Sequence, residues 1–475
     1  MSAATTRPED RVPFHHMVVY GLGGFANNFL SAAIGGMLIV LNIGLGMDPA
    51  LVGFIASIPR LTDALTDPII GYASDNTRSK WGRRRPYIFW GAILAGVCLV
   101  LLWQFPRAWD IQSIYYYVLG GSFVFFLAYT VFATPWVALG YELTPDYNER
   151  TRLMGVQNFF AQVPWVIAPW FLALMQAERF DGDMLAGARW LSFVVAGVVI
   201  VLGVMPALVL RERFSGTDET GNKETLGEKL GGFFKGFAQT LKVVPFLKLA
   251  AATFLIFNGF MLIASFQSYV IIYYVCGGDT ELGAKYIGYA GTAGAIANFL
   301  IIVFVTWLGT KIGKRKAMTV AFTISAIGYA LKWVCYSTTT PWLIVLPAPL
   351  ISFGLAGLFT LVGSMIADVC DLDELETGER REGMFGSIFW WVVKLGMSLA
   401  LAGGGLLLNA TGFDVELGGD QSERTLFLLR VFDVVIPVLT TCLAIAAVWS
   451  YKLTEEKMRE VRDQLEARRG KLPAG

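Results

Sequence analysis

Runs of roughly twenty apolar residues recur along the whole chain and limit its possible folds more than any other feature. Each run is long enough to cross a hydrocarbon core about 30 Å thick as a helix. The runs lack the alternation of barrel strands, and backbone groups in lipid must be satisfied internally, so helices are favoured. We count twelve runs, at residues 16–45, 50–75, 86–106, 113–142, 152–177, 189–211, 246–276, 282–309, 317–337, 341–368, 384–410 and 424–452.

Composition agrees with a membrane protein. Of the 475 residues, 55% are hydrophobic and only 16% are charged, whereas soluble domains carry about 25% charged residues. The formal net charge of +1 gives no reason to expect a nucleic-acid partner. No nucleophile–base pattern or metal motif occurs, so we expect neither an enzyme nor a bound cofactor.

Lysine and arginine are concentrated in alternate loops between the runs, among them 78–85, 211–245 and 311–316, and in the C-terminal tail. Such an excess marks the cytoplasmic side of a membrane. Both termini therefore fall on the cytoplasmic side, as an even number of spans requires. We expect a multi-pass protein of the inner (plasma) membrane, surrounded by lipid.

The chain divides into two similar halves. SDNTRSKWGRRRP follows the second run and GTKIGKRKAM follows the eighth, which indicates an internal duplication with parallel repeats. We predict an all-α membrane protein whose twelve transmembrane helices form two six-helix bundles. The predicted parts are a first bundle at 1–211 that holds the cation site, a cytoplasmic linker with an amphipathic helix at 212–245, a second bundle at 246–452 and a cytoplasmic tail at 453–475.

Three ionisable residues share one face of the second run. Arg60, Asp63 and Asp67 are spaced three and four apart, which aligns them on a helix. A charge near the bilayer centre costs at least about 2.5–3.5 kcal/mol, so these side chains should face the bundle interior. Two carboxylates one turn apart repel, and they need the arginine, a bound cation or a proton between them.

The same two carboxylates, with the hydroxyls of Thr66 and Thr130, suit a hard cation such as Na⁺. They suit a proton equally, since burial and repulsion favour the neutral form of one carboxyl group. A static Arg60–Asp63 ion pair that braces two helices is the alternative interpretation.

Charged residues also occur in the second half. Lys394 in the eleventh run has no acidic residue on its own helix, and the two aspartates of the second run are its expected partners. We interpret Lys332 as structural, together with an Arg430–Asp433 pair at a spacing of three.

Polar and aromatic side chains within the runs are candidates for a solute-binding surface. Amides and aromatic faces suit the alternating O–H and C–H surfaces of a sugar. Interhelical hydrogen bonds and contacts at the lipid interface are the alternative roles. The candidates are Asn27, Asn28, Gln157, Asn158, Trp136 and Trp391.

Three separated motifs, DALTDPIIGYASDNTRSKWGRRRP, DLDELETGERREG and VVKLG, occur in this order. The chain resembles the glycoside–pentoside–hexuronide:cation symporters of the major facilitator superfamily over essentially its whole length. The resemblance implies a major facilitator fold and import by alternating access, and we expect a monomer. It also implies a cation site at Asp63, Asp67 and Thr130, with Thr66 at the family's asparagine position and with Arg60 and Lys394 as charge partners.

The resemblance has departures on the solute side. Asn28 and Asn158 stand where the family has a charged sugar clamp, and Ala133 and Val137 replace a further aspartate and a tryptophan. A neutral clamp therefore replaces a charged one. At the cytoplasmic side we expect charge pairs to latch the two halves, formed by Asp75, Arg83, Arg84, Arg380 and Arg381.

These features predict a symporter that imports a neutral glycoside or related polyhydroxy solute with Na⁺ or H⁺. The alternative is a proton-coupled exporter or antiporter of amphipathic compounds on the same fold. That alternative predicts solute movement against an inward cation gradient and a more apolar cavity, and the amides in the first and fifth runs argue against it.

Overall fold

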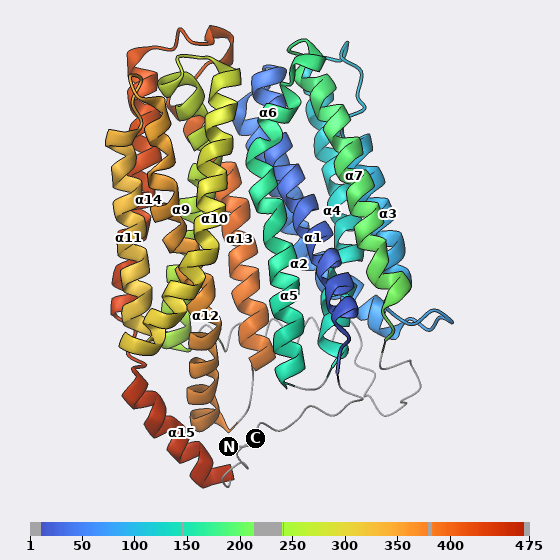
Figure 1. The fold of residues 1–475 in the computed structure, drawn as a ribbon, viewed down its shortest axis with the longest axis vertical. Helices are drawn as coiled ribbons and strands as arrows, with labels where there is room; N and C mark the ends of the chain where they lie inside the picture. Colours follow the sequence, from blue (N-terminus) through green and yellow to red (C-terminus); the bar gives the residue numbers. More distant parts are fainter. Residues whose placement is uncertain (1–10, 145–146, 213–239, 241, 379–381, 470–475) are drawn as a thin grey trace. The chain divides into compact units, whose positions relative to one another are not determined.

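The computed structural model describes residues 11–144, 147–212, 240, 242–378 and 382–469, and these residues form helices and short connections without a strand (Figure 1). They divide into two compact units, Met1–Leu226 and Gly227–Gly475. The all-α fold predicted from the sequence is therefore confirmed. The amphipathic helix expected between Leu226 and Leu241 lies outside the described residues.

The first unit contains six long passes of helix. Its elements are α1 (Phe14–Met37) continued by η2 (Val40–Gly44), α2 (Pro49–Asn76), α3 (Arg85–Leu101), α4 (Ile111–Glu142), α5 (Tyr147–Ile167) continued by η3 (Ala168–Trp170) and α6 (Phe171–Met175), η4 (Glu178–Phe180) and α7 (Met184–Val209).

The second unit repeats this plan and adds a helix after its last pass. Its elements are α9 (Val244–Tyr269) continued by η5 (Val270–Val275), α10 (Thr280–Ile312), α11 (Lys314–Cys335), η6 (Pro341–Val345), α12 (Pro347–Thr377), α13 (Glu382–Ala410), η7 (Val415–Leu417), α14 (Glu423–Trp449) and α15 (Glu455–Arg469).

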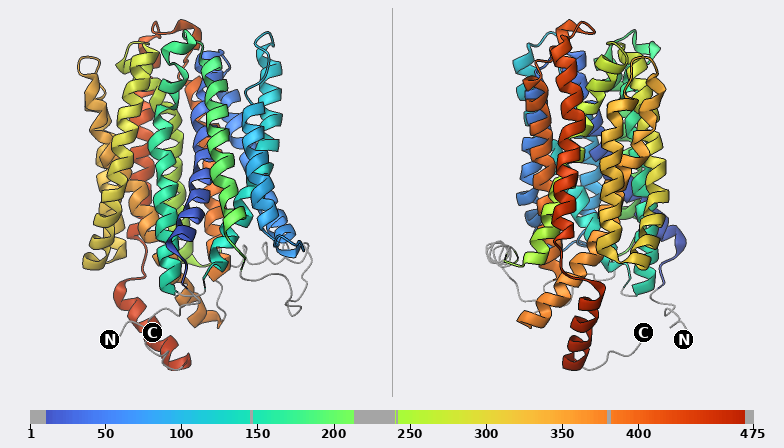
Figure 2. Two further views of the ribbon diagram at one scale, coloured as in Figure 1. Left: turned by 45° about the vertical axis from the view of Figure 1, so that its right-hand side comes forward. Right: turned by 90° about the vertical axis from the view of Figure 1, so that its left-hand side faces the viewer.

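Ten helices among the described residues are long and apolar enough to cross a membrane. Shorter apolar stretches, at Pro49–Thr62 of α2 and Arg85–Leu101 of α3, account for the two other predicted spans. The α2 helix itself continues to Asn76. Within each unit the long passes run side by side along one common direction (Figures 1 and 2).

In each unit a glycine lets the third and fourth passes approach closely. A Cβ atom on Gly91 of α3 would lie 2.5 Å from the backbone nitrogen of Phe132 in α4. A Cβ atom on Gly328 of α11 would lie 2.8 Å from the backbone nitrogen of Ile351 in α12. Lipid provides no hydrophobic driving force between helices, so such close van der Waals contacts hold the bundles together.

Arginines join the third and sixth passes of each unit. Arg189 Nε donates to the Trp103 carbonyl at 3.0 Å, and Arg430 Nη2 donates to the Trp333 carbonyl at 2.9 Å in the other unit. These carbonyls lie at the C-terminal ends of helices, where orphan acceptors and the helix dipole favour a cation. The matched contacts agree with the internal duplication inferred from the loops.

Arginines make the same kind of contact at the opposite ends of these helices. Arg85 Nε donates to the Ala207 carbonyl at the end of α7 at 2.6 Å. Arg315 Nη1 donates to the Tyr451 carbonyl after α14 at 3.2 Å. The antiparallel pairs α3–α7 and α11–α14 are thus capped by arginine at both ends.

A buried ion pair joins α11 to α14. Lys332 Nζ lies 2.8 Å from Asp433 Oδ1, and the side chains are 0% and 1% exposed. The expected Arg430–Asp433 pairing is replaced by this contact, because Arg430 instead stacks on Tyr274 and Trp333, 4.3 and 4.4 Å from the ring centroids. Spacing along one helix identified the acid, but its partner came from the neighbouring helix.

Replacing Lys332 alone should therefore destabilise the second unit strongly. Lys332→Met leaves the Asp433 carboxylate buried without its cation, at an expected cost of about 3–5 kcal/mol. The double variant Lys332→Met/Asp433→Leu should recover most of this loss, since no charge is then buried. Apparent melting temperatures in detergent measure both effects, and a double variant as unstable as Lys332→Met would contradict the interpretation.

Candidate cation site and cytoplasmic charge network

Side chains of α2 and α4 form a cluster of oxygen atoms inside the first unit. Thr134 Oγ1 donates to Asp67 Oδ1 at 3.2 Å, and the Thr66 and Thr130 hydroxyls lie 3.4 Å apart. Thr130 is 1% exposed, and the other three residues are half-buried. The structure therefore pairs Thr66 with Thr130 and places Asp67 on Thr134, one turn further along α4.

Sequence reasoning did not identify Thr134, which contacts Asp67 directly. The signal was present, because Thr134 lies four residues after Thr130 and so shares its face of the helix. One carboxylate and three hydroxyls supply the oxygen ligands that hard cations prefer. A carboxyl group bonded to a hydroxyl can also carry a proton, so this geometry suits either coupling ion.

The interface between α2 and α4 continues from this cluster to Arg60. Its guanidinium carbon lies 5.1 Å from the centroid of the Phe126 ring, an arrangement typical of a cation–π contact. Phe126 lies four residues before Thr130, so the aromatic ring and the hydroxyls share one face of α4. The side chain of Asp63 lies outside the described part of the structure, and its roles in the site or in a pair with Arg60 stay predictions.

Lys394 and Trp391 belong to α13 of the second unit, where both side chains are half-buried. The expected pairing of Lys394 with the aspartates of α2 joins residues of different units and stays a prediction.

The amides of α1 and α5 have different surroundings. Asn28 Nδ2 donates to the Gly24 carbonyl at 3.0 Å, and Asn28 Oδ1 accepts from Trp165 Nε1 at 3.1 Å. Asn158 is exposed, and Gln157 is half-buried. Asn28 thus joins α1 to α5 and holds an indole that sequence reasoning did not single out.

Trp136 was expected to line a solute-binding surface, but the structure buries it. It is 2% exposed, its ring stacks on Tyr20 at a centroid distance of 5.0 Å, and Nε1 donates to the Tyr20 carbonyl. A Cβ atom on Gly23 would lie 2.3 Å from that Nε1 atom, so α1 and α4 touch here. Trp136 is a core residue of the first unit in this structure and not the wall of an open surface. The neighbouring Asn27 Oδ1 is buried and has no hydrogen-bond partner among the described residues.

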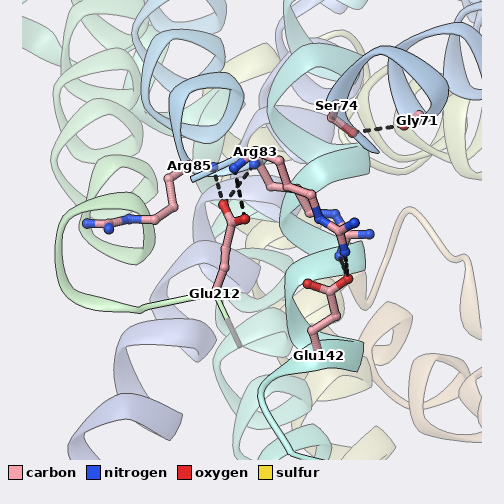
Figure 3. A network of polar contacts seen from close by, with 7 residues as sticks. Gly71, Ser74, Arg83, Arg85, Glu142 and Glu212 are labelled. Atoms are coloured by element: carbon pink, nitrogen blue, oxygen red, sulfur yellow. Dashed lines mark hydrogen bonds and ion pairs between the residues drawn. The ribbon is translucent and has the colours of Figure 1, made fainter. Parts of the chain in front are cut away.

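The predicted gating arginines Arg83 and Arg84 meet an acid at the end of α4. The Arg83 guanidinium forms an ion pair with Glu142, and Arg84 Nη1 lies 2.8 Å from Glu142 Oε1 (Figure 3). Arg84 and Glu142 are largely buried, which strengthens the attraction between their charges.

A second acid, Glu212, holds the same loop through its backbone. Its carboxylate accepts hydrogen bonds from the backbone N–H groups of Arg83, Arg84 and Arg85 at 2.9, 2.7 and 2.9 Å (Figure 3). These groups lie at the N-terminus of α3, where donors are unpaired and the helix dipole favours an anion. Gly82 has φ +105°, and a Cβ atom there would lie 2.6 Å from Glu212 Oε1.

The second unit contains the counterpart of the arginine–glutamate contact. Lys314 follows Gly313, another glycine with positive φ, and its Nζ lies 2.7 Å from Asp368 Oδ2 on α12. Sequence reasoning did not single out Glu142, Glu212 or Asp368. The predicted gating residues Arg380 and Arg381 and the side chain of Asp75 lie outside the described residues.

Removing the Glu212 carboxylate should loosen this loop. Glu212→Ala leaves three N–H donors without their acceptor, and we expect the free energy of unfolding to fall by about 1–3 kcal/mol. These three N–H groups form an anion-binding cradle, which a sulfate ion can occupy when the carboxylate is absent. Sulfate should therefore raise the melting temperature of this variant more than that of the wild type.

The matched control for this experiment is Glu281→Ala. Glu281 forms an exposed pair with Lys285 at 2.6 Å, and such pairs contribute little to stability. Equal sulfate effects on the wild type and Glu212→Ala would contradict the proposed cradle.

Residues 19–455 match the family model of MFS/sugar transport proteins. The chain belongs to this family. It is 28% identical to an uncharacterized symporter, YnaJ, of Bacillus subtilis over 95% of this chain and 94% of that protein. It is 25% identical to the isoprimeverose transporter of Lactiplantibacillus pentosus over 96% and 92% of the two chains. The protein is thus a multi-pass membrane transporter and not an enzyme, and the resemblance found in the sequence is confirmed.

Solved structures establish the fold independently of sequence identity. A bacterial homologue of the human lysosomal transporter Spinster, inward-facing and unoccupied, has a TM-score of 0.66 at 17% identity and covers 97% of this chain and 99% of its own. A structure described for substrate recognition in proton-dependent oligopeptide transporters has a TM-score of 0.62 at 15% identity, over 94% and 99% of the two chains. The major facilitator fold is confirmed.

Proposed function

We propose that the protein is a symporter that imports a neutral glycoside or related polyhydroxy solute together with Na⁺ or H⁺. The observation that carries the proposal is the contact of Asp67 with the Thr134 hydroxyl, beside the Thr66–Thr130 pair, in a member of a sugar-transport family. A carboxylate surrounded by hydroxyls in a membrane-spanning helix is a charge that a cation or a proton can neutralise.

Ion binding at Asp67 provides the coupling in this proposal. The bound ion neutralises the carboxylate and stabilises the conformation that binds solute, so each ligand raises the affinity for the other by the same factor. Asp63 shares the site, and Arg60 and Lys394 balance the carboxylates after the ion leaves. The coupling ion is the one cofactor the proposal needs.

The solute side is neutral in this proposal. The amides of Asn27, Gln157 and Asn158 supply donors and acceptors for hydroxyl groups, and Trp391 supplies an apolar face. With asparagine at positions 28 and 158, no charged clamp remains to select an anionic sugar.

The cytoplasmic charge contacts set the conformation of each half. The ion pairs of Arg83 and Arg84 with Glu142 stabilise the loop before α3, and the ion pair of Lys314 with Asp368 stabilises the loop before α11. A separate set of residues latches the two halves when the transporter faces outward: Asp75, Arg380 and Arg381. The protein works as a monomer in the inner (plasma) membrane, with both termini in the cytoplasm. The 212–245 linker joins its two halves.

A second candidate solute has one observation in its favour. A sodium-dependent lysophosphatidylcholine symporter of Gallus gallus is 23% identical over 96% of this chain and 90% of its own length. An amphipathic solute would also suit the alternative function predicted from the sequence, a proton-coupled exporter. In that case the solute moves outward while the cation gradient is directed inward.

Replacing Asp67 should uncouple transport. In proteoliposomes, Asp67→Asn should abolish ion-driven accumulation of the transported glycoside, because the charge that the ion neutralises is gone. Thr134→Ala should weaken the apparent ion affinity about three- to tenfold, which corresponds to about one hydrogen bond. Uptake is measured with a panel of radiolabelled methyl glycosides, under a Na⁺ gradient at fixed pH and under a pH gradient without Na⁺.

The control for these variants is Thr306→Ala. The Thr306 hydroxyl donates to the Ile302 carbonyl of its own helix at 2.7 Å and is exposed, so its loss should not change ion affinity. Full accumulation by Asp67→Asn would refute the coupling role. Uptake of lysophosphatidylcholine without uptake of any glycoside would favour the amphipathic solute.

A further inference from the structure

Trp165 of α5 is exposed inside a membrane-spanning segment. Its side chain is 39% exposed, and it lies near the midpoint of the span Arg152–Met175. Tryptophans that anchor a protein at the lipid interface lie at the ends of spans, where the ring reaches the headgroups. The position of Trp165 therefore calls for a different role.

The face of α5 that carries Trp165 is polar. Asn158, Gln162 and Trp165 are spaced four and three apart, so they lie on one face over two turns. Asn158 is exposed and Gln162 is half-buried. An amide that meets hydrocarbon without a hydrogen-bond partner costs at least about 1–3 kcal/mol, so this face is suited to water or a polar solute and not to lipid.

The indole is held in place from α1. Its Nε1–H donates to Asn28 Oδ1 at 3.1 Å, and Asn28 Nδ2 donates to the Gly24 carbonyl at 3.0 Å. Both ends of the amide are therefore engaged within the protein. Asn28 orients the ring of Trp165, a residue that is 39% exposed.

The helix is also interrupted directly beside the indole. Pro164 precedes Trp165 and lacks an N–H donor, and α5 ends at Ile167, where the 3₁₀ turn Ala168–Trp170 begins. Interrupted helices near the membrane midplane form solute sites in several transporter folds.

We infer that Trp165 is the aromatic platform on which the ring of a neutral glycoside stacks, and that Asn28 is a positioning residue that fixes this platform. The inference rests on the proposed function. An indole face covers the C–H side of a sugar ring, while Asn158 and Gln162 provide hydrogen bonds for its hydroxyls. The solute is recognised by its apolar ring face and needs no charge.

The test uses the full-length protein in proteoliposomes with radiolabelled methyl glycosides, whose apolar surface lies almost entirely on the sugar ring. Trp165→Ala should raise KM about tenfold, which corresponds to about 1.4 kcal/mol of lost stacking, and leave Vmax within about twofold. Trp165→Phe keeps a ring but loses the N–H donor, and we expect KM to rise about threefold.

The positioning role of Asn28 has its own readout. Asn28→Ala should raise KM as much as Trp165→Phe does, and the double variant should be no worse than either single variant, because both remove one hydrogen bond. Additive effects would overturn the positioning role. If Trp165→Ala does not fold, Trp165→Phe and Asn28→Ala still decide the question.

The matched control is Trp90→Ala, which removes a tryptophan that is 57% exposed on α3. This variant should keep the wild-type KM. A Trp165→Ala variant that behaves like Trp90→Ala would overturn the inference and leave the proposed function intact. Absence of glycoside uptake by the wild type itself would overturn both.

Discussion

A polar group inside a membrane must find its partner within the protein, and this requirement organises the structure. Water is absent there, so an unpaired charge or amide costs several kcal/mol. Lys332 pairs with Asp433 across α11 and α14, and Asp67 meets Thr134 across α2 and α4. The first pair is fully enclosed and contributes to architecture. The second is half-buried.

The two units share their framework and differ at the site. Arginines cap the third and sixth passes at both ends in each unit, and a basic residue after a positive-φ glycine meets an acid on the following pass in each. Among the described residues, the Asp67 cluster and the Glu212 cradle occur only in the first unit. The repeated contacts thus belong to the scaffold, whereas the Asp67 cluster and the Glu212 contact are particular to the first unit among the described residues.

The solute surface illustrates how a substitution can change a residue's role. Asparagine at position 28 replaces a charged group of the family, and here its amide holds the Trp165 indole. Position 137, where the family has a tryptophan, is valine in this chain. The chain thus has valine at this position of α4 and carries an exposed tryptophan, Trp165, on α5 instead. Because indole and amide are both neutral, this arrangement favours an uncharged solute.

The sequence by itself determined the helical fold, the similar loops and the family, because apolar length and charge distribution depend on local composition. It also identified Asp67 by its spacing on a helix face, whereas Thr66 and Thr130 were chosen for their hydroxyl groups and from the family resemblance. It could not identify partners on other helices. Only the tertiary structure placed Thr134 on Asp67, Glu212 on the α3 N-terminus and Asp433 on Lys332, and only packing buried Trp136 while leaving Trp165 exposed. Contacts between helices depend on rotation and register, which no single helix specifies.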